Sequence, residues 1–110
     1  MVLRVMKAID HLPATVPGKV LANQLMRSAS SVAANYRAAC RAKSRADFIS
    51  KLGIVEEEAD ETIYWMELLL EADLVKADKL VLLIQEANEL VAITVASINT
   101  AWGNPRRERE

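Results

Sequence analysis

The sequence has 110 residues, 52% of them hydrophobic, and its 14 basic and 15 acidic residues give a net charge of −1. This length makes one domain with one core, and the small net charge argues against a surface built throughout to bind polyanions. The sequence has one cysteine, Cys40, so an internal disulfide is excluded and a reducing cytoplasm is the simpler location. We expect Cys40 to be a small, partly buried apolar residue.

Neither a membrane span nor a secretion signal is expected. The sequence contains no run of about 18 uninterrupted apolar residues, the length that a spanning helix needs. Its first residues do not combine an apolar stretch with a small-residue cleavage site. We therefore expect a cytoplasmic protein without membrane contact.

The first expected helix, over residues 2–11, is short. An apolar stripe at helical spacing supports it: Val2, Val5, Met6 and Ile9. Pro13 ends this helix, because a proline disfavours helical conformation in the residue before it. The second helix is expected from Pro17, which suits a first helical position, to about Ala42.

The second helix has a core side and a cationic side. At 100° per residue, the core side holds Leu21, Leu25, Ser28, Val32, Asn35 and Ala39. The opposite side holds Lys19, Arg27, Arg37 and Arg41. Small residues between Ser28 and Ala34 favour close approach of another helix. We expect Asn35 to be partly buried and hydrogen-bonded to a neighbouring helix, since a buried amide needs a partner.

Two further long helices follow. Ser44 and Asp47 match a capping box, so the third helix is expected to run from there to about Ala72. Its stripe has a seven-residue repeat: Phe48, Leu52, Val55, Ala59, Thr62, Met66 and Leu69. Gly53 interrupts it at a cost of about 1 kcal/mol relative to alanine, which indicates close packing there.

The fourth helix is expected from about Lys76 to Ala101. Its stripe repeats the same steps: Leu80, Ile84, Ala87, Val91, Thr94, Ile98 and Ala101. Gly103 and the residues after it stop the helix. The helices together predict an all-α fold, an antiparallel up-down-up-down four-helix bundle with a short first helix, over residues 1–102. Residues 103–110 are expected to be a disordered tail.

Two segments carry a resemblance to a known family. QLMRSASSVAANYRAA resembles the second-helix signature of the "four helix bundle protein" family, named after proteins encoded in 23S ribosomal RNA intervening sequences. Its matching positions include Arg27, Ser31 and Asn35, which we take as a structural motif. SRADFISKLGIVEEEADETIYWMELLLEADL resembles the third-helix signature. The resemblance covers nearly all of residues 2–102.

This resemblance implies an antiparallel four-helix bundle, often assembled as a ring-shaped homopentamer, without established enzymatic activity. The family also includes the accessory variability protein of diversity-generating retroelements. That protein binds nucleic acid through a basic surface and partners a reverse transcriptase. The resemblance therefore implies, as one alternative, a nucleic-acid-binding accessory factor of the same type.

Catalysis and metal binding find little support in the residues. Glu57, Glu58 and Glu61 lie at helical spacing, but di-iron bundles combine glutamates with histidines from two helices. The only histidine, His11, is expected near the C-terminal end of the first helix, where its cation is favoured. No serine or cysteine lies in a nucleophile motif. We expect no cofactor, no metal site and no enzymatic activity.

The cationic side of the second helix is the candidate nucleic-acid-binding surface. Phosphate binding needs clustered lysines and arginines, and the candidates are Arg27, Arg37, Arg41, Lys43 and Arg45. Tyr36 is the one aromatic residue near them that could stack on a base. The alternative is a solvated or ion-paired face.

A second candidate surface lies on the third helix. Tyr64 and Leu68 point away from the predicted core, among Glu57, Glu61 and other acidic residues, and charge-rimmed apolar groups often mark an interface. The short first helix would also leave part of the bundle uncovered. The acidic and basic faces are different patches, so contact between copies would be head-to-tail, which can close into a ring. We expect a cyclic homo-oligomer, with the pentamer implied by the resemblance alone.

Overall fold

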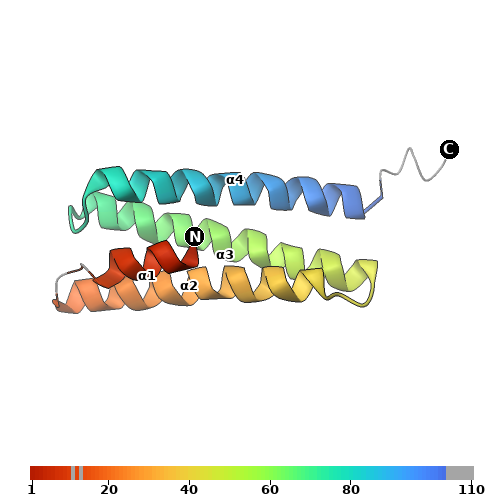
Figure 1. The fold of residues 1–110 in the computed structure, drawn as a ribbon, viewed down its shortest axis with the longest axis horizontal. Helices are drawn as coiled ribbons and strands as arrows, with labels where there is room; N and C mark the ends of the chain where they lie inside the picture. Colours follow the sequence, from red (N-terminus) through yellow and green to blue (C-terminus); the bar gives the residue numbers. More distant parts are fainter. Residues whose placement is uncertain (11, 13, 104–110) are drawn as a thin grey trace.

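The computed structural model describes residues 1–10, 12 and 14–103. Within this part, four helices and no strand are present: α1 (Val2–Asp10), α2 (Val16–Cys40), α3 (Arg45–Glu71) and α4 (Ala77–Ala101). Successive helices run in opposite directions (Figure 1). The predicted all-α, antiparallel four-helix bundle is confirmed, with boundaries within two residues of those expected. His11, Pro13 and residues 104–110 lie outside the described residues.

Side chains cap the starts of α2 and α3, and the cap of α3 is the one predicted at Ser44. The backbone N–H of Gly18 donates to Thr15 Oγ1 over 3.2 Å, so α2 begins just after Thr15 and Pro17 is its second residue. The backbone N–H of Asp47 donates to Ser44 Oγ over 3.0 Å at the start of α3. Each cap satisfies one of the backbone donors that a helix start leaves without an intrahelical partner.

Asp73 ends α3 in a left-handed conformation, with a φ of 55°. Its N–H donates to the carbonyl of Leu70 over 3.0 Å, and the N–H of Leu74 donates to the carbonyl of Leu69 over 3.2 Å. This pair of bonds is a Schellman motif. It reverses the chain within a few residues, so α4 returns along α3.

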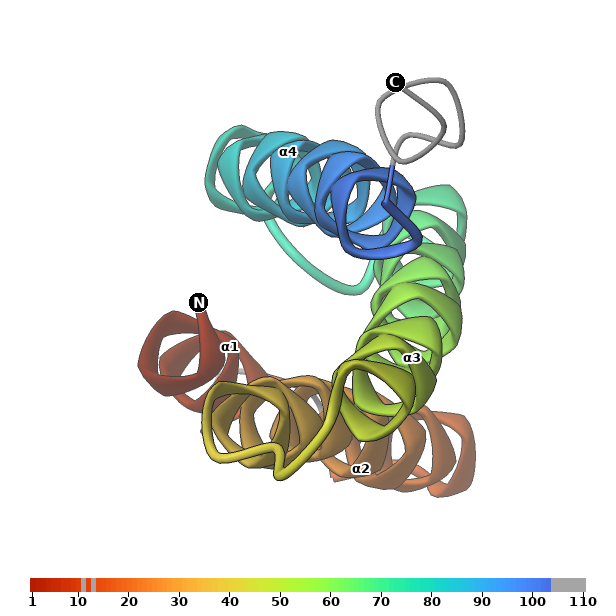
Figure 2. The ribbon, with the colours of Figure 1, turned by 90° about the vertical axis from the view of Figure 1, so that its right-hand side faces the viewer.

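The first helix is much shorter than the others. It has nine residues, while α2 and α4 have 25 each; at 1.5 Å per residue these are about 13 and 37 Å. α2 packs on α3 and α3 on α4, while α1 contacts α2 and α4. Viewed along the bundle, the four helices form an open arc with α1 and α4 at its two ends (Figure 2).

Two core clusters result, and we name the two halves of the bundle after them. The covered half, beside α1, buries Val5, Leu25, Ala29, Ile63, Met66, Leu69, Leu80, Leu83 and Ala87. The open half, beyond α1, buries Val32, Ala39, Leu52, Val55 and Ala59. The open half contains the second part of α2, the first part of α3 and the second part of α4.

Gly53, in the open half, is not closely packed, so that prediction is wrong. A Cβ atom added at this position would meet nothing within 4 Å. The glycine therefore lowers helix stability without allowing a neighbour to come close. Cys40 is also exposed rather than partly buried, because it ends α2 at the outer end of the open half.

Candidate interaction surfaces

Arg27 is held within the chain by two carboxylates of α3. Its Nη1 donates to Glu58 Oε2 over 3.3 Å, and its Nη2 forms a second ion pair with Glu61. Trp65 Nε1 donates to the same Glu61 oxygen over 3.3 Å. The hydrogen bond with Glu61 raises the pKa of Arg27 above its ordinary value. The same bond lowers the pKa of Glu61. The guanidinium is therefore largely occupied in joining α2 to α3.

The other four predicted phosphate-binding residues lie together at the end of α2 and the turn that follows. Arg37, Arg41, Lys43 and Arg45 are all exposed. Within the described residues, Arg37, Arg41 and Lys43 form no ion pair. Arg27 lies ten residues before Arg37, about 15 Å away along the helix. The predicted set of five is thus divided into one ion-paired arginine and a basic group at one end of the molecule.

The predicted interface residues of α3 differ in their accessibility. Tyr64 is 56% exposed and its ring packs edge-on against Trp65, with 4.9 Å between the ring centroids. Glu57 is exposed and Leu68 is half-buried. Glu61 carries the ion pair with Arg27. Tyr64 and Glu57 therefore remain on the surface, while Glu61 is already used within the chain.

Asn35 does not bridge two helices, so that part of its prediction is wrong. The residue is half-buried as expected, but its Nδ2 donates to the carbonyl of Ser31 over 2.9 Å and to Ser31 Oγ over 3.1 Å. Both acceptors lie one turn earlier in the same helix. Of the three motif residues, Asn35 and Ser31 thus bond to each other and Arg27 bonds to α3.

The buried polar contact between α2 and α3 uses hydroxyls instead. Ser28 and Thr62 are both fully buried, and their Oγ and Oγ1 atoms form a hydrogen bond of 2.9 Å. Thr62 also donates to the carbonyl of Glu58 over 2.7 Å. Both side chains are small, so the helices approach closely at this point. The sequence signal for this contact was the position of Ser28 and Thr62, two small residues, on the predicted core sides of the second and third helices.

A feature that the sequence reasoning missed is a groove along the second half of α4. It consists of two adjoining hollows. The first, of about 290 Å³, is lined by Met1, Glu86, Glu89, Leu90 and Ile93. The second, of about 480 Å³, is lined by Phe48, Ile93, Ala96, Ser97, Thr100 and Ala101. We call these hollows together the α4 groove.

The sequence signal for the second hollow of the α4 groove was the absence of charge, whereas Glu86 and Glu89 line the first hollow. Residues 90–101 contain no charged side chain, and within this stretch only Thr94 is buried. Ile93 is 59% exposed. On α2, Tyr36 follows the buried Val32 by four residues, hence on the same face, yet it is 47% exposed. Apolar side chains on both helices thus face solvent where α1 is absent.

α4 is also long and apolar enough to cross a membrane by length and composition alone, with a mean hydropathy of 1.5 over 18 residues. One such helix is weak support for a membrane span, because core helices of soluble bundles meet the same criteria. Here Leu80, Leu83, Ala87 and Thr94 are buried within the bundle. Its other side chains are half-buried or exposed, which distinguishes this helix from a fully packed one.

Within the described residues, no group of three histidine, cysteine, aspartate or glutamate side chains is placed to hold a metal ion. Glu58 and Glu61 each form an ion pair with Arg27. The surfaces described above are therefore the candidate sites of this fold.

Comparison with known proteins gives the family. The model of the family described as 23S rRNA-intervening sequence protein matches residues 1–96. The search of the curated proteins gave no match. A crystal structure of a protein of unknown function from the S23 ribosomal protein family of Bacteroides thetaiotaomicron is similar, with 33% identity and a TM-score of 0.81. The similarity covers 88% of this chain and 90% of that one. The chain belongs to the 23S rRNA-intervening sequence protein family.

Proposed function

We propose that the protein is a non-enzymatic interaction module that assembles with copies of itself, a second copy covering the α4 groove. The observation that carries this proposal is the stretch of residues 90–101, which has no charge and one buried side chain. An apolar surface of this extent is unfavourable in water, and exposed apolar patches mark interaction sites.

The position of the α4 groove supports a helical partner. Where α1 packs beside α4, Leu80, Leu83 and Ala87 are buried. The groove begins at Met1, directly beyond α1, and continues along the same side of α4 to Ala101. A helix from another copy, continuing the line of α1, would give the open half the fourth helix that the covered half already has.

The outer face of α3 is the surface that suits this role in the second copy. Tyr64 offers an exposed apolar ring, and around it are exposed acidic side chains: Glu57, Asp60, Glu67 and Glu71. These carboxylates form no ion pair within the described residues. The open half carries the exposed cations Arg37, Arg41 and Lys43. Attraction between the two patches would orient a head-to-tail contact, which closes into a ring when its rotation permits.

Paired charge insertions test both patches. Ile93→Glu with Thr100→Glu places charge in the α4 groove, and Tyr64→Glu with Leu68→Glu places charge on α3. Each pair should reduce the mass measured by light scattering at micromolar concentration to that of a monomer, with helicity retained in circular dichroism. Val16→Glu with Val20→Glu, on exposed apolar positions of α2, is the matched control and should keep the assembled mass.

Mixing the two variants tests the head-to-tail geometry. Each variant retains one intact patch, so the mixture should form a heterodimer and nothing larger, whereas each variant alone stays monomeric. A wild-type protein that is monomeric at micromolar concentration and moderate salt contradicts the proposal. A larger wild-type mass with no heterodimer in the mixture would place the contact on other surfaces.

Nucleic-acid binding is a second candidate, favoured by one observation. α2 contains no acidic residue, and Arg37, Arg41 and Lys43 are exposed at its end without an ion pair in the described residues. These side chains, with Arg45, could contact phosphates without reading bases. A reverse transcriptase would then be the protein partner that the resemblance to retroelement accessory proteins implies.

Salt dependence and charge reversal test this second candidate. Binding to RNA or DNA should be weak, independent of sequence and sharply reduced by salt. Arg37→Glu with Arg41→Glu should abolish it. Arg27→Glu should change it less, because Arg27 is paired with Glu58 and Glu61. A gel-shift titration in which the Arg37 and Arg41 double variant binds as well as the wild type would exclude this surface.

A further inference from the structure

A cleft between α1 and α4, in the covered half, is separate from the surfaces discussed above. Its main hollow, of about 380 Å³, is lined on α1 by Arg4, Lys7, Ala8 and Asp10, and on α4 by Lys79, Leu82 and Leu83. A neighbouring hollow of about 300 Å³ shares Ala8 and Lys79 and adds Leu74, Val75 and Lys76. We call the two together the α1–α4 cleft.

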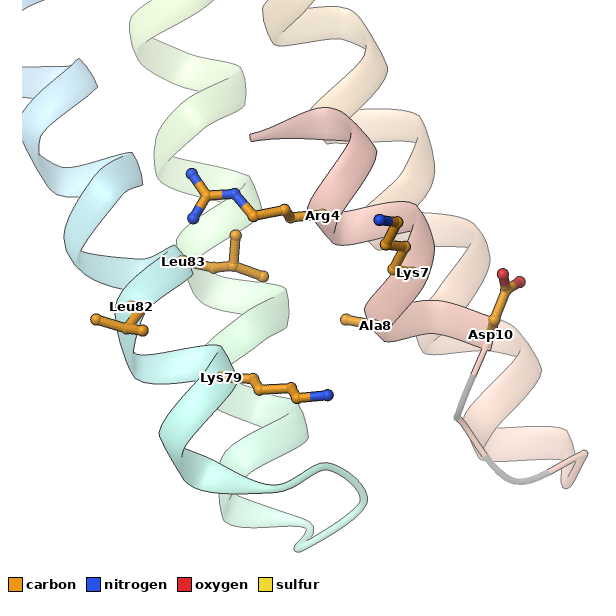
Figure 3. Close-up of a pocket in the computed structure, with 7 residues that line it drawn as sticks. All are labelled: Arg4, Lys7, Ala8, Asp10, Lys79, Leu82 and Leu83. Carbon is orange, nitrogen blue, oxygen red and sulfur yellow. The ribbon is translucent and has the colours of Figure 1, made fainter.

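The walls of this cleft are apolar. Figure 3 shows the side chains of Ala8 and Leu83 directed into the space between α1 and α4. Leu74 and Val75 extend this wall into the neighbouring hollow. Each hollow falls in the size range of small-molecule sites, which are concave, mainly apolar and provided with a few polar groups.

The rim of the cleft is cationic. Lys7, Lys76 and Lys79 are exposed and form no ion pair within the described residues. In Figure 3 the Lys79 side chain reaches from α4 towards α1, while Asp10 points away from the space between them. Arg4 is ion-paired with Glu86. Three ammonium groups without an ion pair in the described residues therefore line an apolar cleft, against the single carboxylate of Asp10.

We infer that the α1–α4 cleft binds a single-chain fatty acid of medium length in its carboxylate form. The hydrocarbon would lie between Ala8 and Leu83, and the carboxylate would meet the ammonium groups of Lys79 and its neighbours. From Lys76 to Leu83 the helix rises about 10 Å, which an extended chain on the order of eight to ten carbons spans. A free phosphate would leave the apolar walls empty, and a cationic amphiphile would meet three like charges. This inference does not depend on the proposed self-association.

A chain-length series is the first test. Hexanoate, octanoate and decanoate are titrated as monomers into the protein by isothermal calorimetry. Each buried methylene should lower the dissociation constant about fourfold, the equivalent of about 0.8 kcal/mol. Decyltrimethylammonium has the same chain with the opposite charge and should bind at least tenfold more weakly than decanoate. Equal binding of the two amphiphiles would overturn the inference.

Matched variants locate the site. Lys79→Glu should weaken decanoate at least tenfold, whereas Lys43→Glu, the same charge change at the other end of the molecule, should leave the affinity unchanged. Ala8→Phe should fill the cleft and abolish binding. Lys79 is exposed, so its reversal tests the inference even if Ala8→Phe unfolds α1. The inference would be contradicted if the Lys79 and Lys43 variants bound decanoate with equal affinity. It would also be contradicted if the cleft bound an acidic amphipathic peptide but did not bind decanoate.

Discussion

The covered and open halves of the bundle are built from the same three long helices, α2, α3 and α4, yet they differ in how completely they are closed. In the covered half, four helices surround large fully buried side chains such as Leu25, Met66, Leu69 and Leu80. In the open half, three helices surround mainly small ones, among them Ala39 and Ala59. The difference follows from the nine residues of α1, which reach only part of the way along α4.

This difference divides the molecule into a region that provides stability and a region that is available to a partner. A side chain surrounded by four helices loses more contacts when it is truncated than one beside an open face. The apolar stretch of α4 in the open half packs on the core only in part: Leu90, Val91 and Ile98 lie against the cluster, while Ile93 is exposed. Changes that act on one half and not on the other test this interpretation.

The largest expected difference comes from truncating one leucine in each half of α3. Leu69 and Leu52 are 1% and 2% exposed, so they are matched in residue type, helix and burial. Leu69→Ala should lower the unfolding free energy by about 3–5 kcal/mol and Leu52→Ala by about 2–3 kcal/mol, because neighbours beside an open face can relax into the space. Urea denaturation of dilute protein measures both. Equal losses would mean that the open half is as tightly packed as the covered half.

A smaller effect is expected from Gly53→Ala in the open half. The added Cβ would meet nothing within 4 Å, so the substitution should raise the unfolding free energy by about 1 kcal/mol through helix propensity alone. Gly103→Ala is the contrasting control: Gly103 has a φ of 69°, which alanine adopts only with strain. If thermal or urea denaturation finds no gain at Gly53 in dilute protein, packing must occupy that space.

The smallest effect concerns the ion pair between α2 and α3, which lies outside both cores. The bond from Arg27 lowers the pKa of Glu61 below its ordinary 4.5. Its contribution to stability is therefore fully present above pH 4.5 and is lost as the pH falls through the lower folded-state pKa. Glu61→Gln should flatten the acid limb of a stability-versus-pH curve. Glu57 lies one turn earlier and forms no ion pair in the described residues, so the acid limb of Glu57→Gln should stay steeper than that of Glu61→Gln. Identical curves for the two variants would show that the pairing does not affect stability.

Much of the fold could be predicted from the sequence because apolar periodicity directly reports which helix face is buried. On α3, Leu52, Val55, Ala59, Thr62, Met66 and Leu69 were assigned to the core and are all buried. Pro17 and Ser44 placed the starts of α2 and α3, since backbone geometry and capping are local properties. On α4 the same periodicity was less informative: Val91 and Ile98 are only half-buried, because α1 does not reach that part of α4. Ile84, in the covered half, is also only half-buried.

The candidate sites were harder to predict because they depend on which helices meet. The wheel placed Arg27 on a cationic surface, but only the packing of α2 on α3 brings Glu58 and Glu61 to it. Asn35 occupies the core edge as expected, yet Ser31 in its own helix satisfies its amide. Gly53 suggested close packing because a glycine lowers helix stability, but the structure leaves space at that position instead. Periodicity cannot specify such pairings.

The most direct test of the central claim, that another copy covers the open half, is the rate of thiol labelling at Ile93. With Cys40→Ser as background, Ile93→Cys and Val20→Cys provide single thiols at sites that are 59% and 52% exposed in the isolated chain. As protein concentration rises into the micromolar range, alkylation should slow several-fold at position 93 and stay constant at position 20. Equal rates at the two positions over the whole concentration range would contradict the claim that a second copy covers the α4 groove.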